Sequence, residues 1–305
     1  MKGSKYFLFF ILFFSKNIFS QGSVVFFTGT SSSGKTTTLN IFKKFLEQQG
    51  MNHYDCLSCD FFVRDTFYES VKKHLNCDDS FEEVLIRLHN KEINKEIINE
   101  FEIKAEYNGF INFINKITEL VKSDKNVLCE CVLPSNKKLL ERMFNLLKDV
   151  RTFFVLVYCS FEDLQIFVNE RNAKASEAKT FEERCNWRDL SDVISQFCEY
   201  YKPFDVEKDN EKDVLDPFLC DDEIISIADK IDDDIKKKFL KHFFSLEEEQ
   251  DSRINIELTP CLNYNFIIKN EWNNPIGEEQ IKKMFKLFLI SSKETFLSNE
   301  KFFIR

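Results

Sequence analysis

A loop bounded by two glycines near the N-terminus constrains the fold of this 305-residue chain more than any other feature. The loop reads GTSSSGKT from Gly29 to Thr36 and fits the pattern GxxxxGK[ST] at every fixed position. The apolar run SVVFFT precedes it, and an amphipathic stretch follows it up to Gly50. A buried strand, a glycine-bounded loop and a helix in direct succession predict an α/β fold that holds phosphate groups at a helix N-terminus.

The residue types of this loop suit a phosphate ligand. Backbone N–H groups must point inward around a β-phosphate, and we expect a side chain at Gly29 or Gly34 to obstruct them. We expect Lys35 to reach the β- and γ-phosphates, Thr36 to hold Mg²⁺ through its hydroxyl, and Thr37 to contact the α-phosphate side. The predicted nucleotide contacts are Gly29, Thr30, Ser31, Ser32, Ser33, Gly34, Lys35, Thr36 and Thr37.

Strand-like and helical patterns alternate after the loop. Short apolar runs predict further strands at 54–59, 126–133 and 152–159. Helical patterns fill the segments 61–122, 135–148 and 161–173. Within the first of them, the run DSFEE from Asp79 to Glu83 is typical of a helix start. This alternation predicts a three-layer fold of the P-loop NTPase type, in which helices cover both faces of a mostly parallel sheet.

Three segments are predicted along the chain. Residues 1–21 resemble a signal peptide, 22–230 form the nucleotide-binding domain, and 231–305 form a small α+β extension of unknown role. The extension has strand-like pieces at 254–258 and 264–268 and a basic amphipathic helix at about 278–290.

The N-terminus points to export. Lys2 and Lys5 precede nine apolar residues, Tyr6 to Phe14, and a small residue, Ser20, follows, as in a secretory signal peptide. The apolar run is about half of the roughly 20 residues that span a bilayer, so we expect no stable membrane span after signal removal. A secreted or periplasmic location follows from the signal, whereas a need for ATP favours the cytoplasm or delivery into another cell.

Composition narrows the class of partner. A hydrophobic fraction of 43% with 30% charged residues is typical of a folded domain. The net charge of −9, without a cluster of basic residues, argues against nucleic acid as a partner. Ten cysteines could form five disulfides, but Cys129 and Cys131 alternate along one predicted strand and cannot bridge each other, so we expect reduced and mostly buried thiols. No residue pattern predicts a particular oligomeric state.

Two carboxylates follow the predicted strands. Asp60 comes directly after the second strand, at the sheet edge where ligands bind in α/β folds, and can accept the proton of an attacking hydroxyl. It could instead cap a helix that begins at Phe61. Glu130 interrupts an apolar strand, and a carboxylate there needs a partner, which could be Mg²⁺ through water, Lys35 or an arginine. A structural ion pair is the other reading of Glu130.

A basic segment from 171 to 188 is a candidate lid. Arg171, Arg184 and Arg188 could close on the phosphates and expel water, or they could be ordinary surface charges.

These motifs together resemble the chloramphenicol phosphotransferase-like kinases. The resemblance covers about residues 23 to 215 and includes TGTSSSGKTT, Asp60 after the second strand, NVLCECVL, VLVYC and RDLSDVISQFCEYY. It implies a P-loop kinase fold, ATP and Mg²⁺, with Asp60 as catalytic base, Lys35 and Thr36 as phosphate and metal contacts, and Arg171 as a lid arginine. Glu130, which we assign to the metal with Thr36, stands where the family has Asp.

The resemblance predicts a kinase that moves the γ-phosphoryl group of ATP to a hydroxyl of a small molecule. Two alternatives remain open. One is a zeta-toxin-like sugar-nucleotide kinase, with which the DxxxR of Asp60 and Arg64 is compatible. The other is an exported, non-catalytic nucleotide-binding protein whose C-terminal helix docks a partner.

Overall fold

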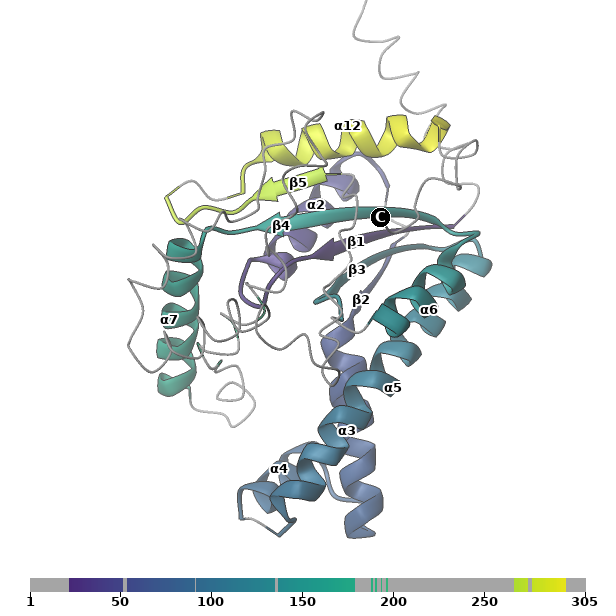
Figure 1. Cartoon of the computed structure of the whole chain (residues 1–305). Coiled ribbons are helices and arrows are strands. Elements are labelled where there is room, and N and C mark those ends of the chain that lie inside the picture. Colours follow the sequence, from purple (N-terminus) through teal and green to yellow (C-terminus); the bar gives the residue numbers. More distant parts are fainter. Residues whose placement is uncertain are drawn as a thin grey trace, which may run out of the picture.

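The computed structural model describes residues 22–51, 54–90, 92–134, 137–178, 188, 190, 193, 196, 266–273 and 276–294. Within them, five strands form one sheet in the order β2-β3-β1-β4-β5, and every neighbouring pair is parallel (Figure 1). The strands are β1 (Ser23–Thr28), β2 (Tyr54–Ser58), β3 (Asn126–Cys131), β4 (Arg151–Tyr158) and β5 (Phe266–Lys269). The predicted mostly parallel sheet is confirmed.

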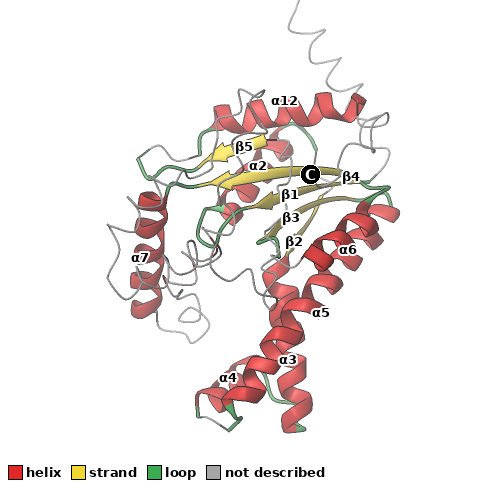
Figure 2. Cartoon of the chain, in the orientation of Figure 1, coloured by secondary structure: helices red, strands yellow, loops and turns green. Residues whose placement is uncertain are grey.

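The central strand β1 is buried along its whole length because helices cover both faces of the sheet. Val24 and Phe26 point into a core with α5 (Lys95–Lys122) and α6 (Lys137–Leu147). Val25 and Phe27 point into a second core with α2 (Lys35–Gln48) and α12 (Glu278–Glu294). Figure 2 shows the strands between these two helix layers. The continuous apolar run that predicted this strand follows from burial on both sides.

The stretch 61–122, for which helical patterns with a helix start at Asp79 and Ser80 were predicted, contains three helices. They are α3 (Cys59–Leu75), α4 (Phe81–His89) and α5, and they project from the sheet as an arm with α4 at its tip (Figure 1). Asn76 ends α3 in a left-handed conformation with φ of 49°. Ser80 then starts α4 with a capping box, in which its hydroxyl accepts from the Glu83 N–H and the Glu83 carboxylate accepts from the Ser80 N–H.

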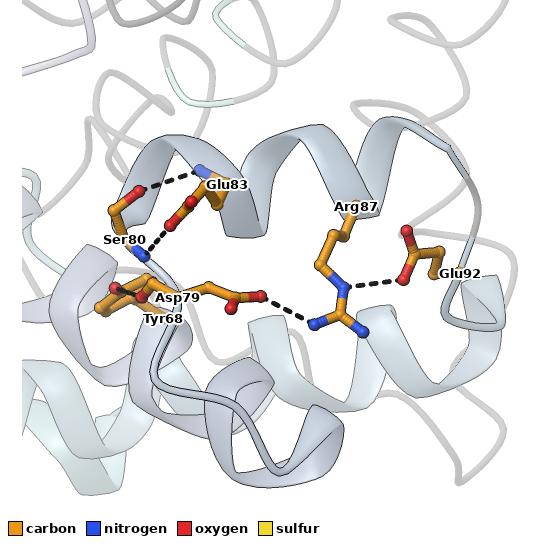
Figure 3. A network of polar contacts seen from close by, with 6 residues as sticks. All are labelled: Tyr68, Asp79, Ser80, Glu83, Arg87 and Glu92. Atoms are coloured by element: carbon orange, nitrogen blue, oxygen red, sulfur yellow. Dashed lines mark hydrogen bonds and ion pairs between the residues drawn. The ribbon is translucent and has the colours of Figure 1, made fainter.

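A polar network ties the arm tip together (Figure 3). Arg87 donates from Nη1 to Asp79 Oδ2 and from Nε to Glu92 Oε2, both at 2.7 Å. The Tyr68 hydroxyl donates to the backbone carbonyl of Asp79. Val71, Val84 and Ile93 form a small core beside this network, separate from those of the sheet. The tip therefore has its own stabilising contacts, away from the sheet.

The described part of the C-terminal extension belongs to the same sheet. β5 pairs with β4, and Phe285 of α12 packs on Phe42 and Phe45 of α2 with ring centroids 6.5 and 5.3 Å apart. The division near residue 230 stays a prediction, as do the signal peptide at 1–21 and the strand at 254–258, which lie outside the described residues. None of the helices in the described ranges has the length and apolar composition needed to cross a bilayer.

The thiols that the structure describes are unbridged, as expected. Four of them are buried, namely Cys59, Cys129, Cys131 and Cys159. Burial raises the pKa of Cys131 to about 12, so this thiol stays protonated at neutral pH.

Candidate functional site

The loop between β1 and α2 has the backbone geometry that requires its two fixed glycines. Gly29 has φ of 142° and Gly34 has φ of 95°, a region that side chains disfavour. A Cβ on Gly29 would lie 2.5 Å from the Val157 carbonyl oxygen, and one on Gly34 would collide with the side-chain amide of Asn270. The protein's own atoms therefore exclude a side chain at both positions. From the sequence, these glycines were explained by the phosphates alone, and this second reason was not predicted.

Lys35 begins α2 and lies across the loop. Its Nζ donates to the carbonyl oxygens of Gly29 at 3.1 Å and Thr30 at 2.7 Å. Burial lowers the pKa of Lys35 below the ordinary lysine value, and the carboxylates of Asp60 and Glu130 act in the opposite direction. A cation held by two carbonyl oxygens, with two carboxylates in its vicinity, is placed to bind an anion at the N-terminus of α2.

Thr36 and Glu130 meet beside the loop. The Thr36 hydroxyl donates to Glu130 Oε2 at 2.5 Å. Glu130 lies near the end of β3, opposite Phe27 of β1 on one side and Ser58 of β2 on the other. The carboxylate that interrupts the apolar strand thus has a hydroxyl partner, and the pair offers oxygen donors at the carboxyl edge of the sheet.

Asp60 lies in the first turn of α3, with an exposed side chain. The reading of Asp60 as the cap of a helix that begins at Phe61 is wrong, because the helix begins at Cys59 and Ser58 holds the N-cap position. Arg64, one turn further along α3, places its guanidinium over the rings of Phe61 and Phe81 at 4.8 and 5.2 Å. The DxxxR pair is therefore not assembled at the site, because Arg64 turns toward the arm.

Arg171 approaches the loop from α7 (Phe161–Glu177). Its Nη1 lies 3.5 Å from the Ser32 hydroxyl, and burial together with the charge of Arg188 lowers the pKa of its half-buried guanidinium. Arg188 is held near α7, since the Asn172 side chain exchanges two 2.8 Å hydrogen bonds with its backbone. Arg184 lies outside the described residues.

These side chains border one cavity of about 880 Å³. The predicted residues that line it are Ser31, Ser32, Gly34, Lys35, Thr36, Thr37, Asp60, Glu130 and Arg171. Gly29, Thr30 and Ser33 are the buried residues of the loop and do not line the cavity. The described residues contain no cluster of three or more His, Cys, Asp or Glu side chains that could hold a metal by themselves.

Other lining residues were not found by sequence reasoning. Asn270, Glu271 and Trp272 follow β5, and Phe167 of α7 packs edge-on against Trp272 with centroids 5.4 Å apart. Gln196 accepts a hydrogen bond from the Ser31 N–H at 3.1 Å. The signal for Asn270 was available, because a polar residue directly after a parallel strand lies at the edge of the sheet where ligands bind.

Several solved structures resemble the chain. A sugar kinase from Janibacter sp. aligns at 9% identity over 89% of this chain and 97% of its own, with a TM-score of 0.37. A gluconokinase from Sinorhizobium meliloti aligns at 10% identity over 91% and 97%, with a TM-score of 0.33. The APS kinase of Mycobacterium tuberculosis aligns at 17% identity over 54% and 76%, with a TM-score of 0.31. Among curated proteins, no significant sequence match was found.

The family comparison is more decisive. Residues 22–180 match the family described as chloramphenicol phosphotransferase-like protein. The match covers more than half of the chain and includes the loop, Asp60, Glu130 and Arg171. Since the expected resemblance is thereby confirmed and the phosphate-binding loop faces a single cavity, the chain belongs to the chloramphenicol phosphotransferase-like family and is a phosphotransferase of the P-loop kinase class.

Proposed function

We propose that this kinase moves the γ-phosphoryl group of ATP to a hydroxyl of a small molecule, with Asp60 as the general base. One observation carries the proposal: Lys35, Thr36, Asp60, Glu130 and Arg171 line a single cavity although they come from four separate segments of the chain. Phosphoryl transfer needs a cationic cradle, a metal-binding pair and a base around one space, and these residues supply those parts.

The proposed step is a direct displacement. The acceptor oxygen bonds to the γ-phosphorus while the bond from that phosphorus to the bridging oxygen breaks, and ADP leaves with the electron pair. Asp60 accepts the proton of the acceptor hydroxyl. Lys35 and Arg171 stabilise the negative charge on the phosphoryl oxygens.

Thr36 and Glu130 fit Mg²⁺ as ligands. Their oxygen atoms lie 2.5 Å apart, and Mg²⁺ prefers oxygen donors, often one or two protein groups with substrate phosphates and water. When bound, Mg²⁺ neutralises charge on the β- and γ-phosphates. The role of the protein is to hold the Thr36 hydroxyl and the Glu130 carboxylate together at the carboxyl end of β3.

The acceptor enters from the side of α3 in this proposal, because α3 carries Asp60 in its first turn. Ser58, Asp60 and Val132 border the cavity near the ends of β2 and β3, whereas Trp272 follows β5 at the other edge of the sheet. A hydroxyl-bearing antibiotic and a nucleotide sugar are the two acceptor classes to test.

The substitution Asp60→Asn tests the base. We expect kcat for acceptor-dependent ATP consumption to fall about 10²- to 10⁴-fold with KM for ATP within about twofold, since a general base contributes that much to rate. The matched control is Asp65→Asn, an exposed carboxylate on the same helix, which should retain the kcat of the unmodified protein.

Acceptors are screened as a panel of hydroxyl-bearing antibiotics and nucleotide sugars, with Lys35→Ala to identify turnover that needs the loop. Unchanged kcat in Asp60→Asn would remove Asp60 from the mechanism. Tight ATP binding without acceptor-dependent turnover would instead favour a nucleotide-binding protein that is not a kinase toward these acceptors.

A further inference from the structure

Asn270 joins the C-terminal part of the chain to the phosphate-binding loop. It directly follows β5, and its backbone N–H donates to the Tyr158 carbonyl oxygen of β4 at 2.8 Å. Its side-chain Nδ2 donates to the backbone carbonyl oxygen of Ser33 at 2.9 Å, a buried hydrogen bond between residues 237 positions apart. Only 8% of Asn270 is exposed, so the amide has little access to water as a substitute partner.

This hydrogen bond fixes a peptide plane of the loop. The Ser33–Gly34 peptide is trans, so the Ser33 carbonyl and the Gly34 N–H point in opposite directions. Holding the carbonyl on the Asn270 side therefore directs the N–H of Gly34 away from Asn270. Gly34 lines the cavity, and the Asn270 amide occupies the space that its Cβ would take. The hydrogen bond therefore fixes the direction of the Gly34 N–H, and a phosphate oxygen is bound by backbone N–H groups of fixed direction in such a loop.

The position of Asn270 is itself fixed by α12. The Gln280 side chain accepts from the Lys269 N–H and donates to the Lys269 carbonyl, each at 3.1 Å. α12 also packs against α2, whose first residue is Lys35. Asn270 is therefore held in place by the contacts of β5 with α12, and its side chain donates a hydrogen bond to the loop.

We infer that Asn270 is a positioning residue for the triphosphate of the nucleotide, which it serves by setting the orientation of the Ser33–Gly34 peptide. The inference rests on the proposed function, since it takes ATP as the ligand of this loop. Asn270 lies outside residues 22–180, so the family match does not assign it. The site is completed by the C-terminal part of the chain.

Calorimetric titration of the full chain tests this role with three probes: ATP, inorganic triphosphate and adenosine. Asn270→Leu keeps the approximate size of the side chain and removes the donor. We expect it to weaken ATP and inorganic triphosphate equally, by about tenfold, which is the size of effect that one lost hydrogen bond produces. Adenosine affinity should not change, because adenosine has no phosphate.

Asn126→Leu is the matched control, because Asn126 is also a buried asparagine and its side chain accepts two hydrogen bonds from Ser23 at the start of β1, at the opposite end of the strand from the loop. It should change the melting temperature at least as much as Asn270→Leu does, while triphosphate affinity stays within about twofold. A second variant, Asn270→Gln, retains the amide donor and should recover part of the triphosphate affinity.

The outcomes distinguish the role of Asn270 from the proposed kinase function. Failure of the unmodified protein to bind ATP would overturn the proposed function. Binding by the unmodified protein with equal triphosphate affinity in Asn270→Leu would overturn the role of Asn270 alone. A loss confined to ATP and adenosine would place its effect at the nucleoside. An equal loss of triphosphate affinity in Asn126→Leu would make the effect of Asn270→Leu one of general destabilisation.

Discussion

The buried position of Lys35 disfavours its positive charge, and this affects how ATP binding depends on pH. Burial lowers its pKa, while Asp60 and Glu130 raise it and Arg171 lowers it further. A lowered pKa means that the ammonium loses its proton at a lower pH than an exposed lysine, whose value is 10.5. Since Lys35 neutralises phosphate charge only in its ammonium form, kcat/KM for ATP should fall on the alkaline side with a midpoint below pH 10.5.

A pH profile of kcat/KM measures this limb, because that ratio reports the ionisation of the free enzyme. The neighbouring thiol of Cys131 cannot cause the fall, since its pKa is raised to about 12. Asp60→Asn removes a charge that raises the pKa of Lys35, so the pH at which ATP binding weakens should move lower. A limb that stays in place would mean that another group causes it.

The site residues that sequence reasoning found share one property. Lys35 and Thr36 belong to a contiguous motif with fixed spacing, and Asp60 and Glu130 are carboxylates at the ends of readable strands. Asn270 also follows a strand, but its contact with the loop depends on β5 lying beside β4. That neighbour relation is set by packing between residues far apart in sequence, which a local pattern does not contain.

Gly109 decides how closely two helices of the arm approach. It is buried in α5, and a Cβ there would lie 2.5 Å from the Val63 Cα and 2.8 Å from the Val63 backbone nitrogen in α3. Gly109→Ala should therefore destabilise the protein by about 1–3 kcal/mol through overpacking, although alanine favours a helix by about 1 kcal/mol in an exposed position. Thermal unfolding of the variant and the unmodified protein measures whether the change in stability is a loss or a gain.

The exposed neighbour Asn108 provides the control, since Asn108→Ala changes helix propensity without crowding α3. Because α3 carries Asp60 in its first turn, a displaced α3 should also lower kcat in Gly109→Ala. Increased stability in Gly109→Ala would show that the two backbones can separate at little cost.

The elements differ in how well their sequences specify them. β1, β3 and β4 are buried on both faces, so their apolar runs stand out and were predicted to within about two residues. Within 61–122, the start of α4 at Ser80 was predicted correctly from its capping residues, whereas the end of α3 was not, because α3 ends at Asn76 without a glycine or proline. The single buried face of α5, with Ile111, Ile114 and Ile117, was read correctly.

At the scale of the whole molecule, the nucleotide site is closed by two segments far apart in the chain. The loop at 29–36 follows the first strand, whereas Asn270 follows the last described strand and lies on the same cavity. The arm tip lies away from this cavity, with its own small core and the network around Arg87 (Figures 1 and 3). Ligand binding should therefore stabilise these two regions to different extents.

Amide hydrogen exchange with and without ATP tests this difference. At 100 times Kd, ATP stabilises the native state by about 2.7 kcal/mol, which slows exchange about 100-fold wherever an amide opens only by global unfolding. We expect such slowing at the amides of Lys269 and Asn270, which are bonded to Gln280 and Tyr158, as well as in the loop. Amides of α4 should exchange at unchanged rates, because the tip can open without releasing the nucleotide. Slowing in the loop and not at residues 269–270 would show that the C-terminal part opens independently of the bound triphosphate.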